Sequence, residues 1–483
     1  MKIKNYTAAL AALSLVSCGG NSMVVEHYYS TQEKSFSQEP LSAEALGELT
    51  RTTLEILPAQ TAQSVEGFGA CFNELGWMSL MELTPEERTS IMQELFKAGV
   101  GANFNICRMP VAANDFARDW YSYNETEGDF AMANFSIEND KETLIPFIKA
   151  ALAQNPEIAV WASPWSPPAW MKHNKHYASK SFIMEEKDIY GNDFGNGLPE
   201  DRQGKEGTDM FIVEDAYLDA YGLYFEKFIE GYRAEGIDIF AVMPQNEFNS
   251  NQVFPSCCWT AQGLTTFVGK YLGPRMERLG VDVMFGTMER PNYLLVDTVL
   301  QDPDASKYVK GVGFQWAGKD AIADVRKHYP EMRLLQTEQE CGDGQNDWAG
   351  LLHSWELLKH YFDNGVSIYD YWNISLNEGG ISRWGWRQNS LVVVDPATKK
   401  YRYTLEYDLM KHASGFVAVG AQYVATESAD GVQALAFKNP NGDIVVIYVE
   451  TEGKDRSIAM KVGDKTTDCL VKANSMNTFV IRG

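Results

Sequence analysis

The sequence predicts an α/β protein: a closed (β/α)8 TIM barrel with a β-sandwich at its side. From about residue 63, short apolar runs alternate with stretches of helical spacing, which is the pattern of βα units. Eight such runs occur, the number of strands that closes this kind of barrel. From about residue 400 the chain changes to short strands without helices, so we place a second domain there.

The N-terminus has the features of an export signal. Lys2 and Lys4 precede the apolar stretch "AALAALSLV", which is too short to span a bilayer. The letters "LVSCGG" resemble a bacterial lipobox, in which cleavage before Cys18 exposes that cysteine for lipid attachment. An ordinary secretory signal with a chance cysteine is the alternative. We predict an exported bacterial lipoprotein, at the cell surface or in the periplasm, with residues 1–18 as signal peptide and residues 19–45 as a polar tether.

The two domains follow from the order of the remaining elements. A lone strand, "TTLEIL", lies in residues 46–62 ahead of the barrel and is expected to join the C-terminal sheet. Residues 63–399 form the predicted barrel, and residues 400–483 form the β-sandwich, with a hairpin signal at "NPNGD". The eight candidate barrel strands are residues 64–72, 104–111, 158–165, 239–247, 281–289, 309–316, 333–338 and 367–374.

Helix signals separate these strands. Thr84 is a candidate N-cap, followed by Pro85 in the first turn and by Glu87, whose carboxylate completes a capping box. Another helix follows Thr260, because apolar residues recur after it at the spacing of one helix face.

Composition excludes several classes of partner. A formal net charge of -23 disfavours phosphate backbones and anionic lipid surfaces, so we expect no nucleic acid and no membrane contact beyond the lipid anchor. No CxxC pair occurs, and we expect no metal and no organic cofactor. Adjacent Cys257 and Cys258 form either a vicinal bridge or two free buried thiols. The protein is expected to be a monomer.

Two carboxylates stand where a barrel places its chemistry. The carboxyl ends of barrel strands meet at one mouth, and Glu247 ends the fourth candidate strand while Glu338 ends the seventh. Hydrolysis of a glycoside needs one carboxyl group to protonate the departing oxygen and another to attack the anomeric carbon or activate water. Two solvated carboxylates at loop entries would look the same in the sequence.

Six segments in chain order resemble the motifs of glycoside hydrolase family 30. They are "EGFGACF" (66–72), "FNICRMPVAANDF" (104–116), "ASPWSPPAWMK" (162–172), "QNE" (245–247), "LLQTEQECGDG" (334–344) and "YDYWNISLNEGG" (369–380). The resemblance runs from about residue 50 to the C-terminus. It implies a retaining β-glycosidase with a barrel and a side β-sandwich.

The resemblance also implies roles for individual residues. Glu247 would be the acid/base and Glu338 the nucleophile, while Asn246 would bond the 2-hydroxyl of the sugar. Glu340 is a rival nucleophile, but it would already have left the strand. Arg108 would keep the nucleophile ionised, or it is simply an ion-pair partner inside the barrel.

Further residues are candidates for sugar binding. Strands three, six and eight end in Trp165, Trp316 and Trp372, which would form a wall or floor of the sugar site unless they pack in the core. Trp384, with Trp386 beside it, lies in the loop after strand eight and suits an outer sugar or the leaving group.

Three positions depart from the pattern of the family. Glu74 lies where the family often has an aspartate that holds distal hydroxyls. Gln315 stands where some members carry histidine, with Ala317 in place of tyrosine, and Phe248 replaces the usual proline. These differences argue against simple transfer of glucosylceramidase specificity.

The expected function is that of a retaining endo-β-1,6-glucanase, which hydrolyses pustulan or fungal wall β-glucan by double displacement. An exo-acting enzyme of the same family is the alternative, as a β-glucosidase, glucosylceramidase-like enzyme, β-xylosidase or β-fucosidase. A lipid-anchored glycan-binding protein with an inactive barrel is a third reading, and the presence of both glutamates argues against it.

Overall fold

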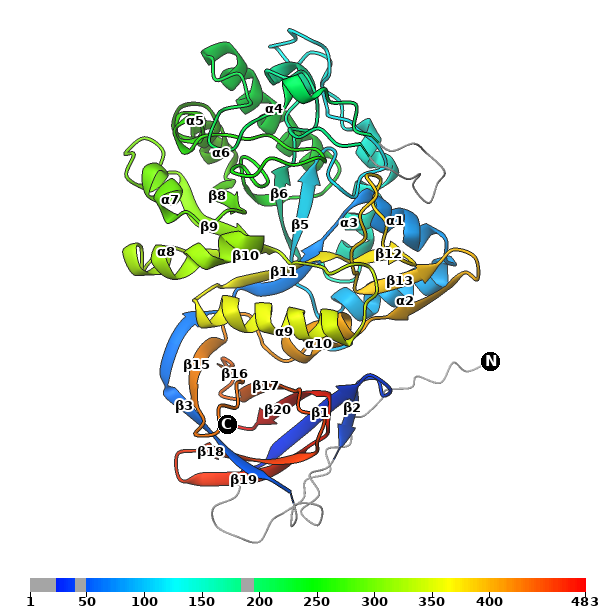
Figure 1. Cartoon of the computed structure of the whole chain (residues 1–483), viewed down its shortest axis with the longest axis vertical. Helices are drawn as coiled ribbons and strands as arrows, with labels where there is room; N and C mark the ends of the chain where they lie inside the picture. The colour runs from blue at the N-terminus through cyan, green and yellow to red at the C-terminus, as the bar shows by residue number, and fades with distance from the viewer. Residues whose placement is uncertain (1–22, 40–48, 184–194) are drawn as a thin grey trace. The chain divides into compact units, whose positions relative to one another are not determined.

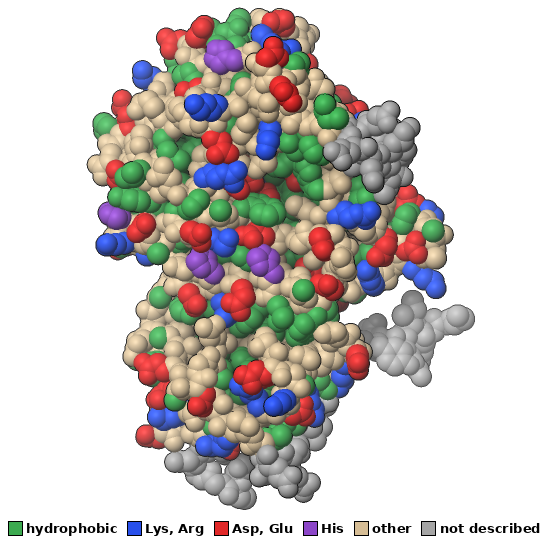
Figure 2. Space-filling model, in the orientation of Figure 1, with side chains coloured by type: hydrophobic (Ala, Val, Ile, Leu, Met, Phe, Trp, Pro, Cys, Tyr) green, Lys and Arg blue, Asp and Glu red, His purple; other side chains and the backbone are tan. Residues whose placement is uncertain are grey.

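The computed structural model describes residues 23–39, 49–183 and 195–483. Within the described chain there are two compact units: residues 62–423, and a unit formed by the residues up to Thr61 together with Val424–Gly483. On the face drawn in Figure 2, acidic and basic side chains are interspersed over both units.

The larger unit contains the predicted closed barrel of eight parallel strands (Figure 1). Around the barrel the strands follow the order β10-β11-β4-β5-β6-β7-β8-β9, so the fold prediction is confirmed. The strands are β4 (Gly67–Cys71), β5 (Ile106–Val111), β6 (Ala159–Pro164), β7 (Ile239–Val242), β8 (Asp282–Met288), β9 (Val309–Gln315), β10 (Leu334–Glu338) and β11 (Ile368–Asn373). Buried side chains fill the barrel, among them Ile106, Trp161, Met243, Met284 and Leu335.

Helices cover the outside of the barrel, and the two whose starts were predicted from the sequence begin at the expected residues. Thr84 caps α2 with the expected capping box, and Thr260 caps α5. The α-helices are α1 (Glu74–Met81), α2 (Pro85–Phe96), α3 (Leu144–Leu152), α4 (Asp215–Ala234), α5 (Ala261–Phe267), α6 (Gly273–Leu279), α7 (Tyr293–Leu300), α8 (Ile322–His328), α9 (Trp348–Asp363) and α10 (Leu405–Ser414). Shorter helical segments are η2 (Glu138–Glu142), η3 (Ala169–Met171), η4 (Glu200–Arg202), the π-helical η5 (Val268–Leu272) and η6 (Trp316–Ala321).

The end of the barrel unit differs from the prediction. After β11, a three-stranded sheet forms from β12 (Ser375–Asn377), β13 (Val392–Asp395) and β14 (Lys400–Tyr403), and α10 follows it. Thr404 caps α10, which buries Leu409 and Met410. The boundary predicted at residue 399 is therefore wrong, because the chain remains in the barrel unit to Tyr423.

The smaller unit is one nine-stranded sheet. Its order is β19-β18-β3-β15-β16-β17-β20-β1-β2, and apolar side chains such as Leu54, Val446 and Phe479 form its core. Its strands are β1 (Val25–Thr31), β2 (Ser37–Glu39), β3 (Arg51–Ser64), β15 (Gln422–Glu427), β16 (Leu435–Lys438), β17 (Ile444–Glu450), β18 (Arg456–Val462), β19 (Lys465–Val471) and β20 (Ser475–Ile481). The lone predicted strand is confirmed as part of β3, which pairs with β18.

The structure corrects the prediction that residues 19–45 form a polar tether. The described part of residues 19–45 contains β1, which pairs with β20 from Val25 to Thr31 and buries His27, Tyr29 and Ser30. Aromatic and β-branched residues give this segment a strand preference that outweighs its polar character. The signal peptide and Cys18 lie outside the described residues.

Two other expectations concern cysteines and membranes. Every cysteine that the structure describes is buried and free, so Cys257 and Cys258 form no bridge. Over the described ranges, no helix combines the length and apolar content needed to cross a bilayer.

Candidate active site

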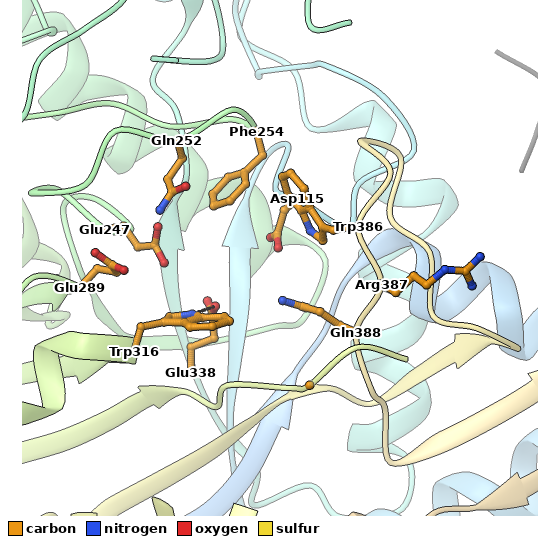
Figure 3. A pocket seen from close by; sticks show the side chains of 11 residues that line it. Asp115, Glu247, Gln252, Phe254, Glu289, Trp316, Glu338, Trp386, Arg387 and Gln388 are labelled. Atoms are coloured by element: carbon orange, nitrogen blue, oxygen red, sulfur yellow. Dashed lines mark hydrogen bonds between the residues drawn. The ribbon is translucent and has the colours of Figure 1, made fainter. Parts of the chain in front are cut away.

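The carboxyl ends of the barrel strands surround a cavity of about 390 Å³ (Figure 3). This volume lies within the range of pockets that bind small molecules. Residues from several different strands and loops line it: Asp115, Glu247, Gln252, Phe254, Glu289, Trp316, Glu338, Gly342, Trp386, Arg387 and Gln388. In Figure 3, Glu247, Glu289 and Gln252 lie on one side of the cavity, and Asp115, Trp386 and Gln388 lie on the other.

Glu247 reaches the cavity through an irregular turn after β7. The strand ends at Val242, five residues before the predicted end, but Asn246 remains attached to the barrel through its N–H, which donates to the Pro164 carbonyl at 2.7 Å. The Glu247 backbone has φ 48°, and its N–H donates to the Thr287 hydroxyl at 3.0 Å. This left-handed turn directs the carboxyl group into the cavity.

Glu338 is the last residue of β10 and is held by several donors. Arg108 Nη1 donates to its Oε2 at 2.8 Å, and Trp316 Nε1 donates to its Oε1 at 3.1 Å. The arginine is fully buried, so this ion pair is screened little by solvent.

One amide group joins the two glutamates. Gln315 Nε2 lies 3.1 Å from Glu247 Oε1 and 3.3 Å from Glu338 Oε2, so these two oxygens are at most 6.4 Å apart. This upper limit admits the separation of about 5–5.5 Å found between the carboxyl groups of retaining glycosidases. The predicted pair therefore meets at one site.

Asn246 is fixed in orientation beside the pair. Its Oδ1 accepts from Arg108 Nη2 at 2.6 Å, from Thr287 Oγ1 at 3.0 Å and from Gln315 Nε2 at 3.1 Å. Three donors around one oxygen identify it as the carbonyl end of the amide. The NH₂ end is left as the donor toward a ligand.

The two carboxyl groups differ in electrostatic environment. Burial, the charge of Glu338 and the charge of Glu289 raise the pKa of Glu247 well above its usual range. Burial also raises the pKa of Glu338, but Arg108, Trp316 and Gln315 oppose that rise by stabilising the anion. Glu247 Oε2 is buried and accepts no hydrogen bond from any described residue. The arrangement favours a proton on Glu247 and a negative charge on Glu338.

The rival carboxylate lies outside the cavity lining. Glu340 accepts from Lys319 Nζ at 2.7 Å and pairs with His353 Nε2 at 2.8 Å. Hydrogen bonds to these two side chains lower the pKa of Glu340 despite its burial. Its carboxyl group is thus engaged in ion pairs, and Glu338 is the glutamate that reaches the cavity.

The three predicted tryptophans occupy two kinds of position. Trp316 lines the cavity, with φ 48° at the end of β9. Trp165 and Trp372 are buried instead and stack at 5.3 Å, with the Arg108 guanidinium 4.3 Å from the Trp165 ring. Both rings contact the guanidinium of Arg108 and do not line the cavity.

The structure corrects the sugar-binding role predicted for Glu74. It begins α1, is 1% exposed, and accepts hydrogen bonds from Arg118, Asn139 and Thr143. These donors occupy both of its oxygens, so it holds the loop after β5 and does not face a sugar. The cavity carboxylate on that side is Asp115.

The structure also corrects the sugar-binding role predicted for Trp384. It is 2% exposed and packs against Ala113 and Ala117, whereas its neighbour Trp386 lines the cavity. Both residues lie in a tight turn in which the Ser382 N–H donates to the Trp386 carbonyl at 2.8 Å. The turn directs the indole of Trp384 into the protein and that of Trp386 to the cavity. The spacing of the two residues in the sequence does not determine which of them faces the cavity.

Sequence reasoning missed two carboxylates of the cavity. Asp115 is 3% exposed, and its Oδ1 is buried without a hydrogen-bond partner among the described residues. Glu289 follows β8 and forms an ion pair with Arg290. A usable signal existed for each: Asp115 lies in the quoted "AANDF" stretch, and Glu289 ends the fifth candidate strand.

The described ranges contain no group of three or more His, Cys, Asp or Glu side chains arranged to hold a metal ion.

A barrel whose mouth holds two buried carboxyl groups, joined by one amide and only one of them paired with an arginine, is typical of a retaining glycoside hydrolase. The chain belongs to glycosyl hydrolase family 30: the family's TIM-barrel domain matches residues 65–198 and 201–417, and its β-sandwich domain matches residues 420–479.

Relatives with named activities fall into two groups. Lysosomal acid glucosylceramidase of Mus musculus is 27% identical over 433 residues, which cover 84% of this chain and 78% of that protein. Endo-1,6-beta-D-glucanase of Neurospora crassa is 24% identical over 469 residues, which cover 89% and 88%. Among solved structures, the endo-beta1,6-glucanase BT3312 superposes with a TM-score of 0.79 at 23% identity, over 95% of this chain and 100% of that one. This last likeness is one of fold.

Proposed function

We propose that this glycosidase is a retaining endo-β-1,6-glucanase, with Glu247 as acid/base and Glu338 as nucleophile. The observation that carries the two roles is the shared Gln315 amide, which holds the carboxyl groups together while Arg108 pairs with Glu338 only. Glu247 therefore keeps its proton, and Glu338 keeps its negative charge.

The reaction proceeds in two displacements. The Glu338 carboxylate forms a bond to the anomeric carbon as the bond from that carbon to the leaving oxygen breaks, and Glu247 gives its proton to that oxygen. Glu247, now ionised, takes a proton from water, and the resulting hydroxide displaces Glu338 from the anomeric carbon. Two inversions return the β configuration. The Asn246 NH₂ donates to the 2-hydroxyl, a bond that strengthens as the transition state forms.

The charge of the cavity favours a neutral glycan. Asp115, Glu247, Glu289 and Glu338 line it, and Arg387 is the lining cation. Carboxylates accept hydrogen bonds from sugar hydroxyls but repel uronate and sulfate groups. A neutral glucan therefore fits this cavity better than an acidic polysaccharide.

The β-1,6 linkage is supported by relatives. The endo-1,6-beta-D-glucanase of Neurospora crassa and the endo-1,6-beta-D-glucanase BGN16.3 of Trichoderma harzianum, at 24% and 23% identity, each align with nearly nine tenths of this chain. These proteins cleave within chains, which supports an endo mode here.

The second candidate is an exo-acting β-glucosidase of the glucosylceramidase type. The higher identity of 27% to the mouse lysosomal acid glucosylceramidase favours it. Against it stand Gln315 and Ala317, which replace the histidine and tyrosine of some members next to Trp316.

A digestion panel separates the two candidates. Purified enzyme is incubated with pustulan, with β-1,3- and β-1,4-glucans and with aryl β-glucosides, and the products are followed over time. A ladder of β-1,6-linked oligosaccharides from pustulan is the expected result. Glucose alone from every substrate would reject the endo mode, and absence of products from pustulan would reject the linkage.

Glu338→Gln is the matched inactive control for the panel. This variant keeps the shape of the side chain but cannot form the covalent intermediate. It should bind pustulan in an affinity gel without releasing sugar.

For the cellular location we propose a membrane-anchored exported lipoprotein, from the sequence "LVSCGG" alone. Labelled palmitate should enter the wild-type protein in a bacterial host and should be absent from Cys18→Ser. Equal labelling of both would reject the anchor.

A further inference from the structure

A group of aromatic side chains continues outward from the cavity wall. We define the aromatic ledge as Trp120, Tyr177, Phe254, Trp384 and Trp386. The ring centroids of Trp120 and Trp384 are 4.8 Å apart, those of Trp120 and Tyr177 are 5.5 Å apart in a stacked pair, and those of Phe254 and Trp386 are 5.0 Å apart. These rings come from four loops that are distant in sequence, so the ledge exists only in the folded barrel.

The ledge is continuous with the active site. Phe254 and Trp386 line the cavity, and both pack against the cluster formed by Ala113, Ala117 and Trp384. Trp120 packs on the same cluster but does not belong to the cavity lining. Trp120 is thus connected to the cavity-lining Trp386 through the cluster on which both pack.

The ledge is only partly explained by core packing. Trp384, at 2% exposure, is the buried member, whereas Trp120, Tyr177, Phe254 and Trp386 are all half-buried. Half-exposed aromatic rings gathered beside a cavity are typical of ligand-binding grooves. Indole and phenyl faces suit the apolar faces of pyranose rings, and Trp and Tyr add a polar edge for hydroxyl groups.

The position of the ledge indicates which end of the glycan it meets. The acid/base protonates the leaving oxygen, so the leaving group lies on the side of Glu247, and the glycone extends away from it. Trp386 lies across the cavity from Glu247, beside Asp115 (Figure 3). The ledge is therefore on the glycone side.

We propose that the aromatic ledge binds the sugars that precede the glycone unit in a β-glucan chain, with Trp120 as the platform for the outermost of them. This inference rests on the proposed endo mode and adds a site to it. An enzyme that removes only terminal glucose has no sugar at this position.

The test is chain-length dependence in Trp120→Ala. The value of kcat/KM is measured on β-1,6-linked gluco-oligosaccharides of two to six units and on pustulan. The matched control is Phe130→Ala, in the same segment between β5 and α3: Phe130 is 39% exposed and contacts Trp170 and Tyr217, not the ledge. Losing one aromatic contact corresponds to a change of about 3- to 10-fold.

The expected pattern is specific. In the wild type, kcat/KM rises with chain length; in Trp120→Ala the rise is lost on the longest substrates by about 3- to 10-fold, while the disaccharide is cleaved as before. Phe130→Ala keeps the wild-type profile. An equal loss at every length, or no loss at any length, would overturn the ledge as a binding site.

The experiment distinguishes an error in the proposed β-1,6 linkage from an error in the proposed binding role of the aromatic ledge. If the wild type cleaves β-1,3- or β-1,4-linked ladders instead of β-1,6-linked ones, the linkage is wrong and the same comparison is made on the ladder that is cleaved. A length-dependent loss in Trp120→Ala on that ladder supports the ledge. If no ladder shows a dependence on chain length in the wild type, the ledge and the endo mode are both rejected.

Discussion

Single residues at the site adopt a backbone conformation that most side chains avoid. Glu247 and Trp316 both have φ 48°, in the left-handed region that costs a residue other than glycine about 1–3 kcal/mol. Thr287 supports the first of these turns, because its hydroxyl accepts the Glu247 N–H and donates to Asn246 Oδ1. Such positions persist where surrounding contacts fix them and where their geometry serves a function.

The roles of the two glutamates predict opposite products in azide rescue. With an activated aryl β-glycoside and azide, Glu338→Ala should give the α-glycosyl azide, because azide attacks directly in a single inversion. Glu247→Ala should give the β-glycosyl azide, because azide attacks the covalent intermediate. On unactivated glucan, Glu247→Ala should lose about 10²- to 10⁴-fold in turnover.

Proton NMR of the azide products checks the assignment. The control is Glu340→Ala, whose carboxyl group pairs with Lys319 and His353 away from the cavity and which should turn over glucan like the wild type. A β-glycosyl azide from Glu338→Ala would exchange the two roles.

Removing the charge of Glu289 should shift the pH profile of kcat/KM. Activity requires Glu247 to be protonated, so kcat/KM falls at high pH as this group ionises. The charge of Glu289, after burial and Glu338, raises the pKa of Glu247, so Glu289→Gln should move the basic limb to lower pH. The control Glu206→Gln, at the outer end of the Arg290 ion pair, should leave the limb nearly in place. An unmoved or raised limb in Glu289→Gln would contradict the electrostatic coupling.

At the scale of elements, the long segment between β5 and α3 carries Asp115 and Trp120 and is held by one buried carboxylate. Asp140, in η2, accepts hydrogen bonds from Tyr121 at 2.9 Å, from Tyr123 at 2.5 Å and from Tyr232 of α4 at 2.5 Å. Burial raises the pKa of Asp140 to about 6, and these three phenols oppose that rise. The segment is therefore connected to α4 through a group that only the folded chain assembles.

Two tyrosines of α4 make a matched pair for testing this connection. Tyr232→Phe removes a donor to Asp140 and should destabilise the protein by about 1–3 kcal/mol. Tyr221 is equally buried, but its hydroxyl has no hydrogen-bond partner among the described residues, so Tyr221→Phe should be neutral or slightly stabilising.

Thermal or denaturant unfolding compares the two variants with the wild type. Equal destabilisation by both substitutions would show that ring packing, and not the bond to Asp140, holds the segment.

Buried acids with raised pKa values affect the stability of the whole molecule. Asp370 lies inside the barrel and accepts from Trp161 Nε1 at 2.8 Å; burial raises its pKa to about 7. Burial likewise raises the pKa of Glu406 to about 7. A raised pKa means that the folded chain binds more protons than the unfolded chain. The contribution of such an acid to the free energy of unfolding is therefore fully present below the unfolded pKa, and it is lost as the pH rises through the folded pKa.

The free energy of unfolding should therefore decrease between about pH 4 and pH 7. Asp370 alone contributes up to about 4 kcal/mol to this change, from a folded pKa of about 7. Asp370→Asn should flatten the decrease, because the amide does not ionise. The control Asp238→Asn, at a side chain 91% exposed, should keep the wild-type slope. Denaturant unfolding over this pH range gives the slopes, and identical slopes in all three proteins would contradict the prediction.

Much of the fold and the central pair could be predicted because the signals are local. Each barrel strand is a short apolar run, and a residue that ends such a run in a barrel is placed at the mouth by topology. Glu247 and Glu338 are found in this way, whereas the roles of Asn246 and Arg108 are implied by the resemblance to the family. The helix α10 was missed because "YRYTLEYDLMKHAS" begins with aromatic residues that also favour strands.

The sequence by itself determined the order of the βα units, the family and the two glutamates at the barrel mouth, although only Glu338 ends a strand. Only the tertiary structure decided which neighbouring side chains join them: Asp115 and not Glu74, Trp386 and not Trp384, with Gln315 between the two carboxyl groups. The physical reason is that loop conformation depends on partners distant in sequence. Glu74 is turned from the cavity by Arg118, Asn139 and Thr143, and no local pattern encodes those contacts.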